Sequence, residues 1–515
     1  MAKTIIDSVT LNFTDLTGAK TGCTKLGSNK FWKGWVEDLG DGTGNFECCW
    51  GATGTPGKDT GSKRGIDLDD AQTLLNKKVK SKVKKGYTLL EVRSDEEEVA
   101  KAADNGVNLT ADKKAPKKKK AVKKSTFNPA IGNLLATIYN ETSRVVTAGL
   151  SSQAGSSADN PIGNLSDAQL DVGGGILDDI EAFLTQELGH EDTANRVQTL
   201  ALSADGVPSD GVIDLTNQYM SNVPREIDRS QRGRGNLHRL VISSFERLEE
   251  QRKFLQLLRD AHLTKGVFKA AANASTGGKE QIWYEGLNCL IELCESGSAE
   301  FKKVSDIFNN NQSRKNQNWF SGGRSTLRLK RIFKFTRNGT DKQFAKYAKE
   351  MASKPNAVGN IFAWHGTRTE NLLGISKTGL LMPENLPRGI HVSGKAFGKG
   401  IYHAPDISKI RTIHGVQTDG TNGALKSMNY TSSRGAYYGS NNTSNSAFMY
   451  LQEVALGNGD VHTAPCWDKH RPNNYPKNDF IYAAAGGCST LSHDELVTFS
   501  QDAQIFRYLL EIEAR

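Results

Sequence analysis

Apolar and polar residues alternate through residues 1 to about 92, and glycines interrupt the alternation. The segment KFWKGWVEDL predicts a strand, GDGTG predicts a turn and NFECCW predicts a second strand. The segment IDLDDAQTLLNKKVK has apolar residues at helical spacing and predicts a short helix. We therefore expect a small sheet packed on one helix in this part of the chain.

From residue 127 the apolar residues recur at intervals of three and four, which is the period of a helix. The apolar residues at 134, 135 and 138 share one face of the first helix. Ser166 opens an S-x-x-Q pattern, a capping box, before a later helix. A further series from Leu237 to Leu258 predicts one long final helix.

After residue 265 the helical period fades, and short apolar runs alternate with Gly- and Asn-rich loops. We expect strands in RLKRIFKF, IFAWHGT, HVSGKAFGKGIYHA, AFMYLQEVALGN, ELVTFS and FRYLLEIEAR. The predicted fold class is a multidomain α+β protein. Its expected parts are a small β/α domain at 1–95, a linker at 96–125, an all-helical domain at 126–264 and an antiparallel β domain at 265–515.

The expected linker has no aromatic residue and ends in eight lysines between Lys113 and Lys124. This composition predicts a disordered segment, because there is little apolar surface to bury. Two interpretations stay open for the lysines: a nuclear localisation signal or phosphate-gripping arm, and a solvated spacer.

The overall composition agrees with several packed domains. The chain has 515 residues, of which 37% are hydrophobic and 8% aromatic, and this length suggests three or four domains. The net charge of +9 fits a polyanion such as nucleic acid as a partner, but it fits many other basic proteins equally well.

The seven cysteines are odd in number and include no C-x-x-C pair. This pattern argues against a disulfide framework and a structural zinc site, and it indicates a reducing compartment. The N-terminal sequence MAKTIIDSVTLNF lacks an apolar signal-peptide core, and no run of about 18 apolar residues occurs. We expect a soluble intracellular protein with no bound metal and no membrane association.

Three features in the last third of the chain could carry chemistry. His365 and Gly366 end an apolar strand, Tyr402 follows a glycine-flanked loop, and Glu495 begins a strand near the C-terminus. A glycine after the histidine lets a ligand approach the backbone closely. Each feature alone has an ordinary structural explanation: a turn, a core tyrosine or a solvated carboxylate.

Their order, however, resembles the poly(ADP-ribose) polymerase branch of the diphtheria-toxin-like ADP-ribosyltransferases. The matching segments are WHGTRTENLLGI, FGKGIYHAPDISK, LKSMNY, LQEVALGN and DELVTFS, and they span about 266 to 515. The resemblance implies an enzyme that uses NAD as a substrate and transfers its ADP-ribose.

The resemblance also implies a nicotinamide pocket. The Gly366 backbone and the Ser427 hydroxyl should hold the carboxamide, and Tyr402 and Tyr430 should sandwich the ring. The adenosine-side ribose should be bound by His365, with two neighbours close by, Thr367 and Asn371.

Glu495 is the residue that this family associates with chain elongation. The resemblance implies that it hydrogen-bonds the nicotinamide ribose, while family members without it transfer single units. A carboxylate there can stabilise an oxocarbenium-like transition state and polarise an acceptor hydroxyl. Lys426 lies at the family's position for a residue near the acceptor and is a weaker candidate.

Two lysine-serine segments follow Tyr402, ISKIR and LKSMNY. The first lies at the usual distance but lacks the later tyrosine, whereas the second has K-S-x-N-Y intact. We choose the second, which implies an insertion at about 404–424. If the first is correct, Ser427 and Tyr430 fall outside the site.

The first domain resembles a WGR domain in VTLNFTDL, SNKFWKGWVED and CCWGATG. The resemblance implies that Trp50 stacks on the sugar at a DNA end, with phosphates held by Asn29, Lys30 and Lys33. Ala52 stands where the motif has Arg, which puts the usual coupling to the catalytic domain in question. The alternative is that Trp50 is only a core residue.

The helical part resembles the family's autoinhibitory regulatory domain in NPIGNLSDAQLDVGGGILDDI and SNVPREI. The implied function is to block NAD access until DNA binding loosens the helices. The glycine run at 173–175 either weakens a helix or marks the start of one.

Together these resemblances imply a polymerase that DNA ends or nicks activate, acting in the DNA damage response and repair in the nucleus. Its acceptors would be itself and chromatin or repair proteins. Two alternatives remain: a mono-ADP-ribosyltransferase and an inactive DNA-binding scaffold.

Overall fold

The computed structural model describes residues 4–19, 27–92, 128–153, 165–189, 198–200, 208–273, 278–310, 327–390, 397–405, 446–462, 478–483 and 494–514. By its internal contacts the chain divides into two compact units. The first unit comprises 1–98, 146–263 and the short segment 387–391, and the second comprises the remainder. We describe each unit by itself.

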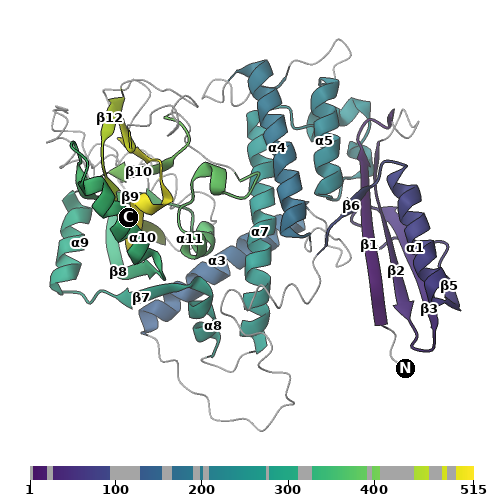
Figure 1. Cartoon of the computed structure of the whole chain (residues 1–515), viewed down its shortest axis with the longest axis horizontal. Coiled ribbons are helices and arrows are strands. Elements are labelled where there is room, and N and C mark those ends of the chain that lie inside the picture. Colours follow the sequence, from purple (N-terminus) through teal and green to yellow (C-terminus); the bar gives the residue numbers. More distant parts are fainter. Residues whose placement is uncertain are drawn as a thin grey trace, which may run out of the picture. The chain divides into compact units, whose positions relative to one another are not determined.

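A small antiparallel sheet, seen beside α1 in Figure 1, forms the first part of the first unit. Its order is β4-β3-β2-β1-β6, and β5 also pairs with β3. The strands are β1 (Thr4–Asp15), β2 (Ser28–Asp38), β3 (Thr43–Ala52), β4 (Lys58–Asp59), β5 (Lys63–Asp67) and β6 (Thr88–Leu90).

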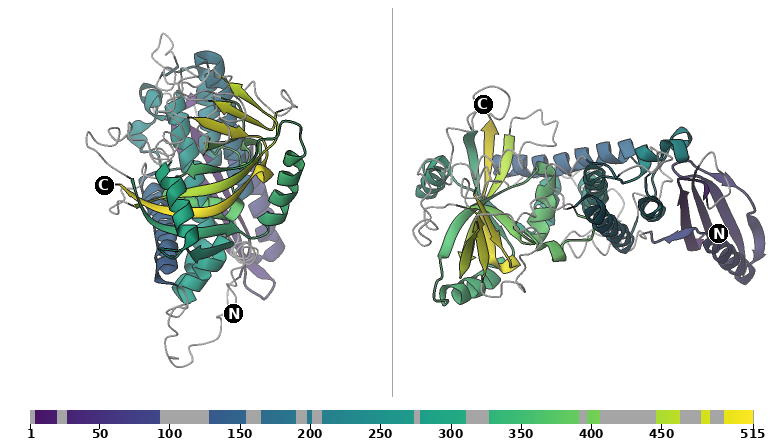
Figure 2. Two further views of the ribbon diagram at one scale, coloured as in Figure 1. Left: turned by 90° about the vertical axis from the view of Figure 1, so that its left-hand side faces the viewer. Right: turned by 90° about the horizontal axis from the view of Figure 1, so that it is seen from above.

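Helix α1 (Leu68–Val83) covers one face of this small sheet, as both views in Figure 2 show. The Asp67 side chain caps the helix by accepting hydrogen bonds from the first free backbone amides. Ala71 and Leu75 of α1 are buried against Trp32 and Phe46 of the strands. The sequence prediction of a small sheet packed on one helix is confirmed.

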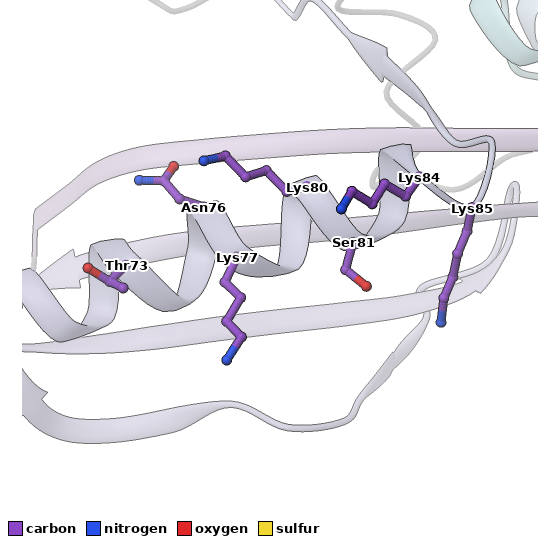
Figure 3. Close-up of a pocket in the computed structure, with 7 residues that line it drawn as sticks. All are labelled: Thr73, Asn76, Lys77, Lys80, Ser81, Lys84 and Lys85. Carbon is purple, nitrogen blue, oxygen red and sulfur yellow. The ribbon is translucent and has the colours of Figure 1, made fainter.

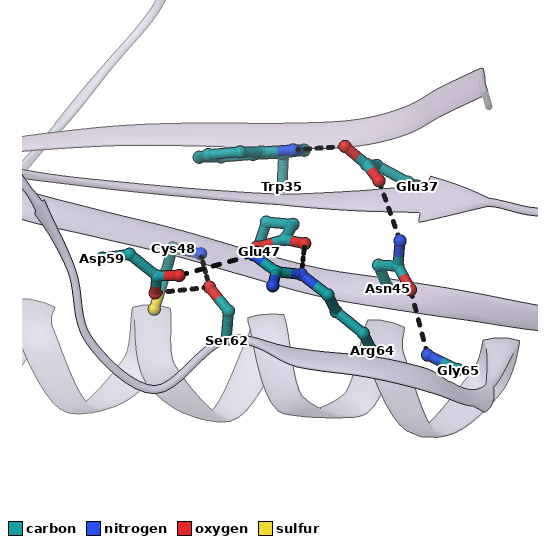
Figure 4. A network of polar contacts seen from close by, with 9 residues as sticks. All are labelled: Trp35, Glu37, Asn45, Glu47, Cys48, Asp59, Ser62, Arg64 and Gly65. Carbon is teal, nitrogen blue, oxygen red and sulfur yellow. Dashed lines mark hydrogen bonds and ion pairs between the residues drawn. The ribbon is translucent and has the colours of Figure 1, made fainter.

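A polar network fastens the outer strands of the small sheet (Figure 4). Arg64 of β5 donates a hydrogen bond to Glu47 of β3 at 3.0 Å. Asn45 donates to Glu37 at 2.9 Å and accepts from the Gly65 amide at 2.9 Å. These contacts hold β3, the strand that carries Trp50, between its two neighbours.

The rest of the first unit is helical. Its elements are α4 (Asp167–Leu188), α5 (Asp210–Asn222), η3 (Arg229–Gln231), η4 (Arg234–Asn236), α6 (Leu237–Leu240) and α7 (Phe245–Asn273), of which α7 continues into the second unit. Ser166 caps α4 by accepting from the Gln169 amide at 3.0 Å. The Gln169 side chain does not close the expected box, because it bonds Glu91 and Asn222 instead.

One detail of the helical prediction is wrong, and one of the two alternatives for the glycine run is excluded. The apolar series from Leu237 to Leu258 does not form one helix, because α6 ends at Leu240 and α7 begins at Phe245. Ser244 starts α7 anew by accepting from the Arg247 amide at 3.3 Å. The glycine run 173–175 is not a helix start, since it lies inside α4.

Close packing explains two of these glycines. A side chain on Gly173 would collide with Val223, and one on Gly174 would collide with the carbonyl of Arg388. The helix therefore accepts the low helical propensity of glycine in exchange for close approach of a neighbouring backbone.

The second unit is built on a large nine-stranded sheet of order β12-β13-β14-β10-β9-β11-β15-β8-β7. The strands are β7 (Cys289–Leu293), β8 (Leu327–Arg337), β9 (Gly359–Gly366), β10 (Ile401–Pro405), β11 (Ser446–Leu456), β12 (Gly459–His462), β13 (Phe480–Ala483), β14 (Glu495–Thr498) and β15 (Gln504–Ala514). All pairs are antiparallel except β12 with β13.

Helices cover the large sheet, and Figures 1 and 2 show them around its twisted strands. They are α3 (Pro129–Gln153), α8 (Gly278–Leu287), α9 (Ala299–Asn310), α10 (Thr340–Ala352) and α11 (Leu372–Thr378), with short turns η5 (Thr369–Asn371), η6 (Pro383–Asn385) and η9 (Gln501–Ala503). The start of α3 packs in this unit, since Tyr139 stacks on Trp283 at 5.3 Å between ring centroids.

Candidate active site and nucleic-acid interface

The three residues predicted for catalysis lie on three neighbouring strands of the large sheet. His365 is on β9, Tyr402 is on β10 and Glu495 begins β14, and β10 pairs with both of the other strands. These strands are distant in sequence, so only the sheet brings the three residues into one region.

The ladder between β9 and β10 is short in the described strands. Its pairs are Ala363 with Pro405 and Trp364 with Ala404, and no pair follows toward Gly366. The next link between the strands is a hydrogen bond from the His365 ring to the Tyr402 carbonyl, 3.3 Å from Nδ1. The strands therefore part at the end of β9, where the backbone of Gly366 is not engaged by β10.

The hydrogen bond fixes the tautomer of His365. A carbonyl oxygen only accepts, so Nδ1 must carry the proton. Burial lowers the pKa of His365 to about 4, although the Tyr402 bond opposes the shift. The ring is then neutral at physiological pH, and Nε2 keeps a lone pair that can accept a hydrogen bond.

A second histidine, His403, lies on β10 next to Tyr402 and is buried. Its Nε2 is 3.1 Å from the Thr498 hydroxyl, which donates to Gln504. Burial, followed by the charge on His365, lowers the pKa of His403 to about 3. No sequence motif marks this residue, and only its burial in the sheet reveals it.

Tyr402 is held by its own loop. Its hydroxyl donates to the Gly398 carbonyl at 2.9 Å and accepts from the Phe397 amide at 3.0 Å. The ring packs beside Phe397 and Val497, in a small apolar cluster. The aromatic face that the ring presents is therefore set by the fold before any ligand arrives.

The residues after His365 form a short polar turn. Gly366 ends β9 opposite Met449 of β11, and Thr367 follows with a buried side chain. Asn371 donates to the Thr367 hydroxyl at 3.2 Å. The two predicted neighbours of the ribose are thus joined to each other.

Glu495 is partly exposed and pairs with Ala483 at the start of β14. Three predicted residues, Lys426, Ser427 and Tyr430, lie outside the described residues, as does the proposed insertion at 404–424 beyond Pro405.

In the small sheet, Trp50 is 44% exposed, whereas its cross-strand partner Trp32 is only 3% exposed. Trp50 is therefore not a core residue. Lys33 is exposed with its Nζ 5.7 Å from the Trp35 ring, and Lys30 is half-buried with its Nζ 5.1 Å from the Phe13 ring.

Asn29, also predicted to meet phosphate, is instead only 2% exposed. Its amide nitrogen donates to the Arg225 carbonyl at 2.8 Å, and its oxygen accepts from Thr14 at 3.1 Å. Both polar atoms of the Asn29 side chain are therefore hydrogen-bonded inside the first unit, and the side chain does not lie on its surface.

Asn29 belongs to a buried polar interface between the small sheet and α5, and no sequence pattern indicates this interface. Thr53 donates to Asn12 at 2.8 Å, and Asn12 donates to the Met220 carbonyl at 3.2 Å. The Ser221 hydroxyl accepts from the Thr14 amide at 3.0 Å. The strand segment that follows Trp50 is thereby hydrogen-bonded to the end of α5.

A second unforeseen contact involves the segment 387–390. The backbone of this segment lies against Gly174 of α4, and Arg259 of α7 donates to the Arg388 carbonyl at 2.7 Å. Arg259 also pairs with Asp171 at 2.9 Å. Helices α4 and α7 therefore both contact the segment 387–390, which precedes the loop before Tyr402 in the sequence.

Within the described residues, every helix is too short or too polar to span a bilayer. The same residues contain no group of three His, Cys, Asp or Glu side chains placed to bind a metal ion. The cysteines within these residues, at 48, 49, 289 and 294, are not joined in disulfides.

Three domain models match the chain. They are the WGR domain at 7–95, the poly(ADP-ribose) polymerase regulatory domain at 125–282 and the poly(ADP-ribose) polymerase catalytic domain at 298–418.

Curated relatives match the chain at low identity. Poly(ADP-ribose) polymerase 1 of Danio rerio is 25% identical over 40% of this chain and 18% of its own length. The protein of the same name from Arabidopsis thaliana is 24% identical over 59% of this chain and 26% of its length. Protein mono-ADP-ribosyltransferase PARP3 of Homo sapiens is 24% identical over 74% of this chain and 64% of its length.

This chain thus spans about a quarter or less of the polymerase 1 relatives, and it spans nearly two thirds of the human one. The three domain matches follow one another along most of the sequence and agree in family. The chain therefore belongs to the poly(ADP-ribose) polymerase family, with WGR, regulatory and catalytic domains in that order.

Proposed function

We propose that this chain is an NAD+ ADP-ribosyltransferase that releases nicotinamide and builds ADP-ribose chains on itself and on other proteins. The observation that carries the proposal is the parting of β9 and β10, which leaves Gly366 beside the fixed His365 and Tyr402. The backbone N–H and C=O of Gly366, which has no ladder pair on β10, are of the type that matches the two hydrogen-bonding groups of a carboxamide.

His365 would bind the adenosine-side ribose. Because its Nδ1–H is committed to the Tyr402 carbonyl, its Nε2 can accept from a ribose hydroxyl. Thr367 and Asn371 lie close by in sequence and are joined by a hydrogen bond. Tyr402 would stack on the nicotinamide ring, and Tyr430 and Ser427 would complete that pocket.

Glu495 would act on the nicotinamide ribose. Breaking the glycosidic bond builds positive charge on the ribose, and a carboxylate beside it lowers the barrier. Nicotinamide leaves as a neutral molecule, so no general acid is required. The same carboxylate can accept a hydrogen bond from the hydroxyl of an incoming acceptor and so polarise it. Lys426 would lie near this acceptor.

A second candidate is single-unit transfer. The relative from Homo sapiens that aligns with 74% of this chain is named a mono-ADP-ribosyltransferase. Glu495 favours elongation through the family resemblance, so product length decides between the two activities.

We further propose that DNA ends activate the enzyme through Trp50. The motif arginine is absent, since Ala52 stands in its place, but the next residue, Thr53, is hydrogen-bonded to Asn12 and so to the end of α5. This buried polar interface offers a route by which DNA at Trp50 could act on the regulatory helices without that arginine.

Autoinhibition has its own support. The contacts of Gly174 and Arg259 with the backbone of 388 hold the segment that precedes the Tyr402 loop. Loosening α4 or α7 would release this segment, as expected of a local-unfolding switch. The proposed parts remain 1–95, 96–125, 126–264 and 265–515, and the proposed location is the nucleus, with roles in DNA damage response and repair.

The test is an NAD turnover assay on the full chain, with and without nicked or blunt DNA, reading product length on a gel. We expect low activity without DNA, strong stimulation by DNA ends and long products. Glu495→Gln should keep NAD cleavage and lose elongation by about 10²–10⁴-fold, because an amide cannot act as the general base toward an acceptor hydroxyl.

Each contrary result removes a separate part of the proposal. Single-unit products from the wild-type chain would establish the mono-transferase. Long chains from Glu495→Gln would remove the role of Glu495, and equal rates with and without DNA would remove activation. An absence of turnover under all conditions would leave a DNA-binding scaffold.

A further inference from the structure

Helix α1 carries an unusual concentration of lysine. Residues 1–92 contain 14 Lys and Arg against 11 Asp and Glu, and six of the 14 lie between 77 and 85. Without that stretch the domain would be net acidic. No Asp or Glu occurs from 71 to 86, so the lysines have no acidic neighbour along the helix.

Three of these lysines form a row on the outer face of α1. Lys77, Lys80 and Lys84 are exposed and follow one another at intervals of three and four residues, which places them on one side of a helix. The opposite side bears the buried Ala71 and Leu75. Figure 3 shows the side chains projecting from successive turns around a shallow hollow.

The hollow also contains small polar residues. Thr73, Asn76 and Ser81 line it between the lysines, together with Lys85. Hydroxyl and amide groups of this kind commonly bind phosphate oxygens alongside lysine. No aromatic or arginine side chain lines the hollow, so it lacks the groups that usually read base edges or stack on bases.

One further lysine, Lys82, approaches the sheet. Lys82 lies with its Nζ 5.0 Å from the Tyr87 ring, and Lys30 approaches the same ring at 5.8 Å. Burial, then the positive charges of Lys85, Lys30 and Lys78, lowers the pKa of Lys82. The lysines of α1 thus extend toward Lys30, on the face of the sheet that bears Trp50.

Folding alone does not account for this array. Like charges four residues apart, as at Lys78 with Lys82 and Lys80 with Lys84, destabilise a helix. The helix dipole favours the cations of the last turn but not those a turn earlier. Within the part of the chain that the structure describes, none of the six lysines forms an ion pair.

Another exposed helix shows the ordinary pattern. Helix α10 carries Lys342, Lys346 and Lys349 at comparable spacing, but Asp341 directly precedes the first of them and Glu350 directly follows the last. Mixed charge is typical of a solvated face. The acidic residues of α1, Asp69 and Asp70, are confined to its first turn, so the charged side chains from residue 77 onward are all lysines.

We propose that the outer face of α1 binds the phosphate backbone of duplex DNA, independently of sequence and of DNA ends. The inference rests on the proposed function only in taking DNA as the partner. A row of lysines contacts phosphates as point charges and needs no broken end, so this surface would hold the duplex beside the break that Trp50 engages.

The test compares the full-length wild type with the triple variant Lys77→Gln/Lys80→Gln/Lys84→Gln. Binding to covalently closed circular duplex is measured over a range of salt concentrations, without NAD. Each lost phosphate contact makes the dependence of log K on log salt shallower by about 0.9, so we expect a change of about 3. At low salt the affinity should fall on the order of tenfold or more.

Two matched variants isolate the effect. Lys342→Gln/Lys346→Gln/Lys349→Gln removes the same charge from α10 and should keep the wild-type slope. The triple Lys→Arg variant of 77, 80 and 84 keeps the charge and should also keep it. Glutamine and arginine are both good helix formers, and circular dichroism confirms that α1 is intact in each variant.

Equal slopes for the two glutamine triples would overturn the inference and leave α1 to solvent or to an acidic protein. An effect on linear but not circular DNA would overturn it too, because the lysines would then belong to the end-binding site. If DNA ends fail to stimulate NAD turnover in the wild type, the proposed activation is refuted. The salt dependence of binding still tests the inference about α1, because it is measured without NAD.

Discussion

The two sheets of this chain treat their functional residues in opposite ways. On the small sheet and its helix, the side chains of Trp50 and of the lysine row at 77, 80 and 84 are exposed to solvent. In the large sheet, His365 is bonded to the Tyr402 carbonyl and Tyr402 is bonded to its own loop. One site is presented to the outside, and the other is arranged internally.

The difference follows from the chemistry each site would perform. Binding a phosphate backbone needs accessible charge but tolerates loose geometry, because the attraction is non-directional and screened by salt. Cleaving a glycosidic bond needs one tautomer and one orientation, and these are fixed by hydrogen bonds in a dry environment. Substituting an exposed binding residue should therefore lower the free energy of unfolding much less than substituting a buried residue.

The largest expected effect uses the paired tryptophans of the small sheet. Trp32→Ala removes a buried side chain and should lower the free energy of unfolding by about 3–5 kcal/mol. Trp50→Ala removes a side chain that is 44% exposed, and it should cost about 1 kcal/mol or less. Urea unfolding followed by circular dichroism measures both.

For stimulation of NAD turnover by DNA ends, we expect Trp50, the exposed tryptophan, to matter although it contributes little to stability. Trp50→Ala should abolish most stimulation of NAD turnover by DNA ends while the basal rate stays constant. Comparable destabilisation by the two substitutions would show that Trp50 supports the fold, and the contrast between the sheets would then fail at Trp50.

The small sheet illustrates what sequence can predict. Alternation in β2 and β3 and the helical period of α1 are local patterns, and all three elements form where expected. The break between α6 and α7 does not follow from periodicity, because both helices continue one apolar series and the cap at Ser244 is a single local hydrogen bond.

The candidate site was predictable as residues but not as an arrangement. His365, Tyr402 and Glu495 stand out through family resemblance, yet their adjacency depends on pairing β10 with both β9 and β14. His403 carries no motif, and the burial of Asn29 depends on Arg225, far away in sequence. Long-range contacts of this kind leave no periodic signal in a single sequence.

The second prediction concerns pH and the two histidines of the large sheet. Both have folded pKa values below the unfolded value of 6.5, about 4 for His365 and about 3 for His403. As pH falls below 6.5 the unfolded chain takes up protons first, so the stability present at neutral pH is lost. Each histidine should contribute up to about 1.4 kcal/mol per pH unit between pH 6 and 4.

His403→Gln tests this expectation because it removes one titrating ring away from the proposed substrate. The variant's melting temperature should fall less steeply than that of the wild type between pH 7 and 4.5. Carboxylates contribute equally to both proteins, so the difference between the curves belongs to His403. Parallel curves would mean that His403 is not held neutral, and the large sheet would be wetter at this point than its burial indicates.

The smallest expected effect lies at the segment 387–390, which by sequence precedes the Tyr402 loop but packs within the first unit. Gly174→Ala would place a methyl group against the Arg388 carbonyl and displace this segment. If the contact restrains the enzyme, activity without DNA should rise about tenfold, which is a typical coupling of about 1.4 kcal/mol. NAD turnover without DNA measures the effect.

Gly175→Ala is the matched control. It makes the same change one residue along α4, but its methyl group meets only the flexible end of the Arg388 side chain, 3.1 Å away. Both substitutions raise helix propensity alike, so greater helix stability cannot explain a difference between them. Activation by Gly174→Ala alone would mean that backbone contact at Arg388 restrains turnover. Equal activity of the two variants without DNA would mean that the contact at Arg388 does not restrain turnover. Any coupling between the small sheet and the large sheet would then use another route.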